Sequence, residues 1–142
     1  MIITHFATAL EAQNVFYEAL QRADLAQMMA VWAEDEDIVC IHPGGPRHTG
    51  NAEVRESWRR IFSRGPELKF ELIAQRTYPG RVLSVHNVHE RISHVEESSP
   101  PTSVIATNVF VLSGHGWRMI LHHGSPMPDQ PVEKDHSPAV LH

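Results

Sequence analysis

Residues 38–50 read Ile-Val-Cys-Ile-His-Pro-Gly-Gly-Pro-Arg-His-Thr-Gly, and the rest of the chain can be understood as built around them. The first four residues are apolar and mostly β-branched, which is typical of a buried strand. His42 follows, and the Pro-Gly-Gly-Pro run after it ends any regular structure. A histidine at the end of a strand, held by a rigid turn, can be aimed into a cavity. His42 is therefore the first candidate for a functional residue.

Three amphipathic helices are predicted on either side of this strand. Apolar residues recur at three-and-four spacing from about residue 4 or 7 to 22, from 24 to about 32, and from 50 to about 63. Asp24 is a suitable N-cap for the second helix, because its carboxylate can accept hydrogen bonds from free first-turn amides. The acidic run at 34–37 reads as a solvated connection to the strand.

The second half of the chain predicts two antiparallel hairpins. A two-residue turn at Pro79-Gly80 would pair Leu72 with Asn87 and Phe70 with His89. In that register His89 faces the helices and His86 faces away from them. The four strands are expected over residues 68–78, 81–92, 103–113 and 116 to about 124.

Both faces of the second hairpin are apolar. Strict alternation puts Asn108, Phe110, Trp117 and His123 on one face, and it leaves His122 on the other. A sheet that is apolar on both sides packs on helices with one face and on another surface with the other. We therefore expect a homodimer formed through the sheet.

Length and composition bound the other possibilities. The chain has 142 residues, a net charge of −5 and no visible basic patch, which argues against a nucleic-acid partner. Its single cysteine, Cys40, excludes an intramolecular disulfide. No apolar run approaches the length of a membrane span, so we expect a cytoplasmic protein with no membrane partner. One domain is expected over 1–125, followed by a flexible polar tail over 126–142.

The order of elements predicts an α+β fold. We expect a cone-shaped, curved antiparallel sheet wrapped around the three N-terminal helices, a cystatin-like roll with an internal pocket. The chain also resembles the SnoaL-like branch of the nuclear-transport-factor-two-like (ketosteroid-isomerase-like) superfamily. The segments that carry this resemblance are Phe16-Tyr17, Val31-Trp32, His42 to Gly45, Gly50 to Trp58 and Trp117 to Ser125.

The resemblance implies roles for three residues. His42 stands where ketosteroid isomerases place the Asp that acts as general base, just before a proline. Asn108 matches their oxyanion-side Asp, and Tyr17 approximately matches their first-helix tyrosine. The chain departs from the steroid isomerases at both carboxylates, which argues against steroid isomerisation itself.

Two functions stay open on the sequence. The first is a cofactor-independent isomerase, lyase or cyclase, in which His42 is the general base and Asn108 and Tyr17 donate to developing oxyanion charge. The second is a non-catalytic ligand-binding or association domain of the same fold. In either case a small-molecule ligand would lie against a common set of side chains. That set is Trp32, Trp58, His89, Phe110, Trp117 and His123.

Metal and nucleophile chemistry find little support. The adjacent His122 and His123 point to opposite faces of a strand and cannot chelate one ion. A metal site would need His42, His89 and His123 to converge without a cysteine or nearby carboxylate, so we expect no metal and no cofactor. No Ser or Cys lies in a nucleophile-elbow context, so the sequence predicts no nucleophilic triad.

Overall fold

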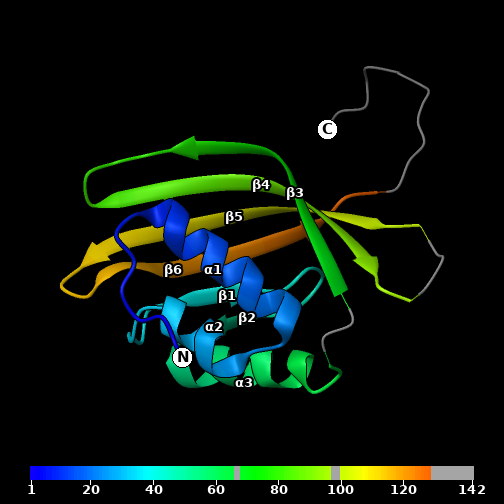
Figure 1. Ribbon diagram of the computed structural model, residues 1–142, viewed down its shortest axis with the longest axis horizontal. Coiled ribbons are helices and arrows are strands. Elements are labelled where there is room, and N and C mark those ends of the chain that lie inside the picture. Colours follow the sequence, from blue (N-terminus) through cyan, green and yellow to red (C-terminus); the bar gives the residue numbers. More distant parts are fainter. Residues whose placement is uncertain (66–67, 97–99, 129–142) are drawn as a thin grey trace.

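The computed structural model describes residues 1–65, 68–96 and 100–128. Within these ranges, three helices lie against a single six-stranded sheet (Figure 1). The helices are α1 (Ala9–Arg22), α2 (Leu25–Val31) and α3 (Asn51–Phe62). The strands are β1 (Val39–Ile41), β2 (Arg47–Thr49), β3 (Leu68–Tyr78), β4 (Leu83–His94), β5 (Thr102–Ser113) and β6 (Gly116–Pro126). They lie in the order β2-β1-β6-β5-β4-β3, and only β1 runs parallel to its neighbour β6.

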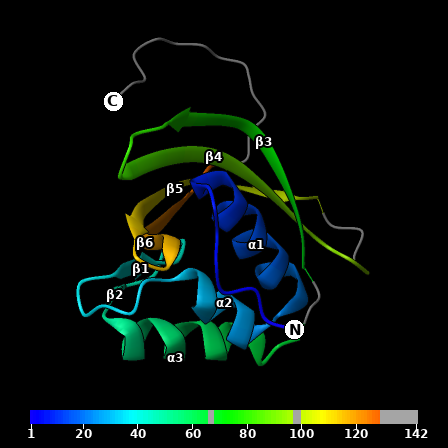
Figure 2. The same cartoon turned by 60° about the vertical axis from the view of Figure 1, so that its left-hand side comes forward.

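The predicted α+β class is confirmed. The long strands curve strongly, and α1 lies across their concave side with α2 and α3 beyond it (Figure 2). The predicted Asp24 cap of α2 is present, since Asp24 Oδ1 accepts from Gln27 N at 3.1 Å. Helix α1 begins later than the expected residue 4 or 7, because Thr8 is its N-cap and Thr8 Oγ1 accepts from Glu11 N at 3.0 Å. The short strand β2 was not predicted, because Pro43 to Pro46 reads as a stop and the three residues after it carry no apolar pattern.

The register predicted for β3 and β4 is wrong. Leu72 pairs with Glu90 and not with Asn87, because the connection after Tyr78 is longer than two residues and a bulge interrupts the ladder between Ile73 and Arg76. The shift of three residues is odd, so it exchanges the two faces of β4. The residues of β4 that face the helices are therefore Ser84, His86, Val88 and Glu90.

A second bulge changes the face of the C-terminal residues of β6. Val109 pairs with Leu121 and Phe110 with Met119, which leaves Ile120 without a partner. One extra residue inverts the alternation beyond it. His122 is therefore buried under the helices and His123 is exposed on the outer face, the reverse of the prediction.

The ends of the domain are only partly described. The expected boundary at residue 125 falls one residue before the end of β6, and most of the predicted tail, residues 129–142, lies outside the described residues. No helix in the described ranges is both long and apolar enough to cross a membrane.

Gly116 lets the N-terminal segment join the sheet, which fixes where α1 begins. Trp117 N donates to Phe6 O at 2.9 Å. Gly116 itself has φ +91°, and a Cβ on it would lie 2.7 Å from Phe6 O. We expect Gly116→Ala to lower the free energy of unfolding by on the order of 3 kcal/mol, from left-handed backbone strain and the clash with Phe6.

Urea unfolding followed by circular dichroism measures this change. Gly114→Ala, in the same hairpin turn, is the matched control: a Cβ there meets nothing within 4 Å. Its effect should stay within about 0.5 kcal/mol. Equal losses in the two variants would show that the approach of Phe6 is not the cause.

Candidate functional site

A row of polar side chains crosses the concave face of the sheet. His86 on β4 lies opposite Asn108 on β5, and Asn108 lies opposite His122 on β6. All three are buried, with Asn108 fully inaccessible. His122 Nδ1 and Asn108 Oδ1 are 2.6 Å apart. Three polar residues in one buried row need hydrogen-bond partners from the element packed above them.

Helix α1 supplies those partners from two positions one turn apart. The Asn108 amide nitrogen donates to Gln13 Oε1 at 2.9 Å and to the Tyr17 hydroxyl at 3.1 Å. Gln13 Oε1 also lies 3.1 Å from His86 Nδ1. We call the group formed by the row, these two helix residues and Glu90 the interior polar cluster. Its members are Gln13, Tyr17, His86, Glu90, Asn108 and His122.

Glu90 ends this chain of hydrogen bonds. It is 3% exposed, and its Oε2 accepts from the Tyr17 hydroxyl at 2.5 Å. Burial raises the pKa of Glu90 to about 7, against the opposing effect of the Tyr17 hydrogen bond. Burial and the neighbouring Glu90 also raise the pKa of Tyr17 well above its ordinary value. Glu90 can therefore hold or release a proton near neutral pH.

The histidines of the cluster are held neutral. Burial, with a smaller effect of His42 and His123, lowers the pKa of His122 to about 3. Burial also lowers the pKa of His86. Because Gln13 Oε1 accepts a hydrogen bond from His86 Nδ1, the hydrogen of neutral His86 lies on Nδ1. Its unprotonated Nε2 is therefore a hydrogen-bond acceptor.

His42, the predicted base, lies beside Trp58, and its hydrogen-bond partners are not members of the interior polar cluster. Its Nε2 lies 3.0 Å from Ser57 Oγ and 3.7 Å from Cys40 Sγ. Its ring meets Trp58 edge-on at 4.6 Å between ring centroids. Burial, and secondarily His48, lowers the pKa of His42 to about 4, so it is a neutral imidazole at pH 7. Trp58 also contacts His122, with 6.1 Å between their ring centroids.

The other predicted ligand contacts divide between interior and exterior. Trp58 and Phe110 are buried against the cluster, Phe110 with its ring 5.0 Å from that of His86. Trp32 is also buried, but it is the C-cap of α2, and its backbone forms an isolated β-bridge with Met119. His89 and His123 lie on the outer face of the sheet, because of the two register changes described above.

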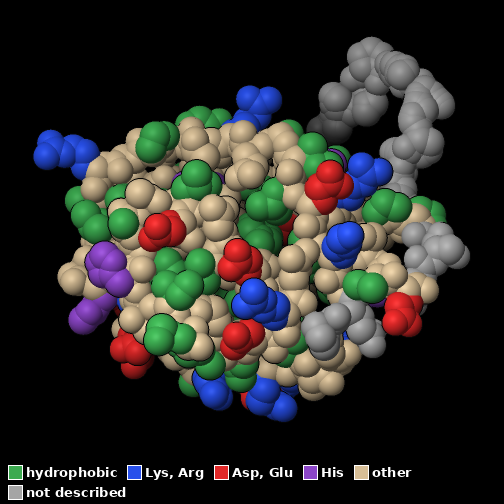
Figure 3. All heavy atoms as spheres, viewed as in Figure 1, with side chains coloured by type: hydrophobic (Ala, Val, Ile, Leu, Met, Phe, Trp, Pro, Cys, Tyr) green, Lys and Arg blue, Asp and Glu red, His purple; other side chains and the backbone are tan. Residues whose placement is uncertain are grey.

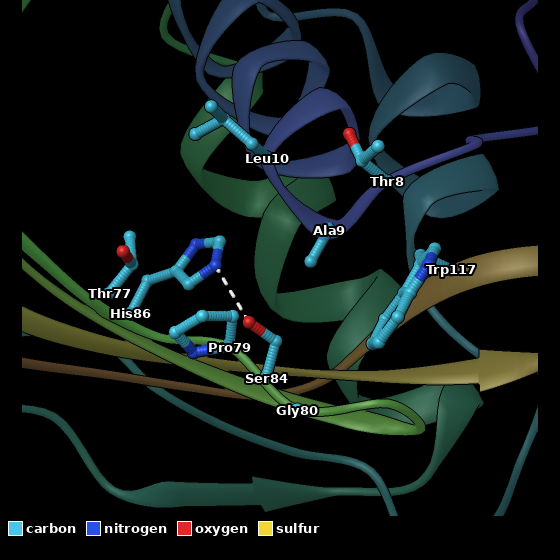
Figure 4. A pocket seen from close by; sticks show the side chains of 9 residues that line it. All are labelled: Thr8, Ala9, Leu10, Thr77, Pro79, Gly80, Ser84, His86 and Trp117. Carbon is cyan, nitrogen blue, oxygen red and sulfur yellow. Dashed lines mark hydrogen bonds between the residues drawn. The ribbon is translucent and has the colours of Figure 1, made fainter.

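Trp117, the remaining predicted contact, forms one wall of a cavity of about 280 Å³ (Figure 4). This hairpin pocket lies between the start of α1 and the connection from β3 to β4. Ser84 and His86 face it from β4, and Ser84 Oγ lies 3.0 Å from His86 Nε2. Through His86 and Gln13 the pocket is linked to the interior polar cluster.

Sequence reasoning found Tyr17 and Asn108 but missed Gln13, Glu90 and the inward face of His86. Gln13 and Tyr17 are four residues apart on one helix face, a spacing that was readable in the sequence. Glu90 was hidden by the wrong register of β4. Among the described residues, no group of three or more His, Cys, Asp or Glu side chains is arranged to hold a metal ion.

The raised pKa of Glu90 leads to a prediction about stability. A carboxyl whose pKa rises from 4.5 in the unfolded chain to about 7 in the fold destabilises the fold as the pH rises between those values. Glu90→Gln removes this loss. We expect the variant to gain on the order of 3 kcal/mol over the wild type between pH 4.5 and about 8.

Denaturant unfolding at a series of pH values measures the difference between the two proteins. The lowered pKa values of His42 and His122 give the opposite slope below pH 6.5, but they are common to both proteins and cancel. Parallel curves would mean that Glu90 does not titrate in this window.

Comparison with known proteins places this geometry in a family. The chain matches the family model described as a SnoaL-like domain over residues 10–130. A solved structure from Thiobacillus denitrificans, assigned as a calcium/calmodulin-dependent protein kinase type II association domain, is 32% identical with a TM-score of 0.77. The alignment covers 87% of this chain and 98% of that one.

Two further relatives carry assignments that differ from an association domain. A protein from Streptomyces avermitilis, assigned as a dehydratase of the NTF2-like family, is 28% identical with a TM-score of 0.75, over 83% of this chain and 92% of that one. The F-box protein SKIP8 of Arabidopsis thaliana is 27% identical over 118 residues. That match covers 83% of this chain but 49% of SKIP8, so the chain spans about half the length of that relative. The family expected from the sequence is confirmed, and the chain belongs to the SnoaL-like domain family.

Proposed function

We propose that this chain is a small-molecule pocket protein that catalyses a cofactor-independent proton transfer of the isomerase, lyase or cyclase type. The observation that carries the proposal is Glu90, a carboxyl buried under α1 whose hydrogen-bond partner is a tyrosine hydroxyl. Burying a carboxyl without a cationic partner is costly, and such groups concentrate at functional sites.

Three residues of the cluster have roles in this proposal. Glu90, with its pKa near 7, takes a proton from the substrate in one step and returns it in another. In the substrate complex, Tyr17 and Asn108 redirect hydrogen bonds to the oxygen on which charge develops, the roles expected from the sequence. Without substrate, the Tyr17 hydroxyl donates to Glu90, and the Asn108 amide donates to Gln13 and Tyr17. Neutral His42 packs against Trp58, and Glu90 replaces it as the principal base.

The surroundings of Glu90 support access by a small apolar substrate. Leu72, its partner on β3, and Phe70, two residues earlier on the same strand, are only half-buried. The cluster contains no Lys or Arg, which favours an uncharged carbonyl compound over an anion. The net charge of −5, and the mixture of acidic and basic side chains on the face in Figure 3, also fit a neutral ligand better than a polyanion.

Exchange of α-protons tests the proposal without knowledge of the natural substrate. Cyclohexanone and 2-cyclohexenone are incubated with the protein in D₂O, and loss of the α-proton signal is followed by NMR. We expect catalysed exchange with an apparent pKa near 7, reduced about 100-fold or more in Glu90→Gln.

Glu71→Gln is the matched control, because Glu71 is an exposed carboxylate on β3 next to β4. It should keep the wild-type rate, and His42→Gln should keep most of it. Loss of exchange in His42→Gln with full activity in Glu90→Gln would transfer the role of base to His42 and contradict this assignment.

A second candidate, a non-catalytic association domain, is favoured by the 32%-identical relative assigned as an association domain. The outer face of the sheet fits such a role, with a second copy of this chain as the partner. Val109 and Val111 lie on it, half-buried. His89 Nε2 there is covered yet has no hydrogen-bond partner among the described residues.

Light scattering tests the dimer that both candidates share. We expect a dimer at micromolar concentration and a monomer for Val109→Glu, because a carboxylate at the centre of the buried face stays unpaired. Ala52→Glu, at an exposed position of α3, should remain dimeric. A monomeric wild type would show that the outer face of the sheet is not a dimer interface.

A further inference from the structure

The hairpin pocket holds a second arrangement of reactive groups, apart from Glu90. Nine residues line the pocket, and none of them is Asp, Glu, Lys or Arg (Figure 4). Trp117 and Leu10 supply apolar wall, and the polar side chains are Ser84 and His86 together with the hydroxyls of Thr8 and Thr77. A mostly apolar cavity with a few convergent polar groups is the usual form of a small-molecule site.

Ser84, His86 and Gln13 form a chain of hydrogen bonds that ends at the pocket. Gln13 Oε1 accepts from His86 Nδ1 at 3.1 Å, and His86 Nε2 lies 3.0 Å from Ser84 Oγ. With the hydrogen of His86 on Nδ1, the free Nε2 accepts the hydroxyl hydrogen of Ser84. A hydroxyl, a base and a neutral group that orients the base are the three parts of an activated nucleophile.

The chain contains a second serine–histidine pair, in which the serine hydroxyl donates to the backbone and not to the histidine. Ser57 Oγ also lies 3.0 Å from a histidine nitrogen, His42 Nε2. Ser57 gives its hydroxyl hydrogen to Val54 O at 2.7 Å, so its oxygen accepts from His42. That serine is a structural bridge within α3, whereas the hydroxyl hydrogen of Ser84 points to a base.

The start of α1 adds donors at the same pocket. Ala9 and Leu10 line it, and Thr8 satisfies the amides of Glu11 and Ala12 but not theirs. Within the described residues, the amides of Ala9 and Leu10 have no hydrogen-bond acceptor. Free first-turn amides of residues that line the same pocket as Ser84 are suited to an oxygen that gains negative charge.

We infer that Ser84 is a nucleophile that accepts a small acyl group from an uncharged ester or thioester bound in the hairpin pocket. Ser84 Oγ bonds to the carbonyl carbon while His86 Nε2 takes the hydroxyl proton. The bond from that carbon to the leaving oxygen or sulfur then breaks, and the leaving group departs with the proton as an alcohol or thiol. Water activated by His86 hydrolyses the acyl-serine to a carboxylic acid and restores Ser84.

The volume of the pocket limits the acyl donor. At about 280 Å³ it is slightly smaller than the roughly 300–1,000 Å³ of pockets for drug-sized ligands. Short acyl groups on small leaving groups therefore fit, and charged acyl groups find no counter-charge among the lining residues.

p-Nitrophenyl acetate is the probe. We expect a burst of p-nitrophenolate approaching one equivalent per chain, a mass increase of one acetyl group in the denatured protein, and peptide mapping that locates the acetyl group on Ser84. Ser84→Ala should lose the burst and the adduct, and His86→Gln should slow acylation by about 100-fold or more.

Ser57→Ala is the matched control and should keep the burst, the adduct and its position. Mapping of the wild-type adduct needs no variant, so a Ser84→Ala protein that failed to fold would not prevent the test. An acetyl group found only on other residues, or a burst that survives in folded Ser84→Ala, would overturn the inference.

Discussion

A row of polar side chains buried across a sheet is stable only when each member has a partner, and this constraint fixes where α1 lies. His86, Asn108 and His122 occupy the concave face, and all three are buried, so their polar atoms need hydrogen-bond partners within the protein. Among the described residues, Gln13 and Tyr17, one helical turn apart, are the α1 residues that hydrogen-bond to that row, and Phe16 packs against His122. A helix moved by one turn would leave several buried donors and acceptors unpaired. The apolar core around Phe16 and Trp58 gives the packing energy, and the polar row gives the register.

The polar groups of this network differ in whether they exchange protons near neutral pH. Burial holds the histidines neutral and raises the pKa of Glu90 toward neutrality, so the cluster contains one group that exchanges protons at ordinary pH and several that do not. That difference separates Glu90 from the other polar groups of the cluster. The chain lacks the paired carboxylates that the ketosteroid isomerases have at the positions of His42 and Asn108. Its interior carboxyl, Glu90, comes from β4 instead.

Two irregularities in the strands decide which side chains enter the interior. The bulge between Ile73 and Arg76 sets β4 against β3 in a register that turns Glu90 and His86 inward, and it brings Gln75 within hydrogen-bond distance of Gln13. The unpaired Ile120 turns His122 inward and His123 outward. Each irregularity adds residues to one strand only, so strict alternation read along the sequence fails beyond it. Both therefore act directly on the candidate sites, and they leave the order of the strands unchanged.

The sequence alone determined the class of fold, the three helices, the limits of the long strands to within two residues at the described ends, and the family. These follow from local periodicity, capping residues and turn residues, which act over a few neighbouring positions. The tertiary structure decided the faces of β4 and of the end of β6, and with them Glu90, His122 and the Ser84–His86–Gln13 chain. Those depend on bulges and on contacts such as Tyr17 with Glu90, 73 residues apart, which no local pattern encodes. The physical reason is the period of two along a strand, since a single inserted residue exchanges inside and outside while leaving the hydrophobic pattern almost unchanged.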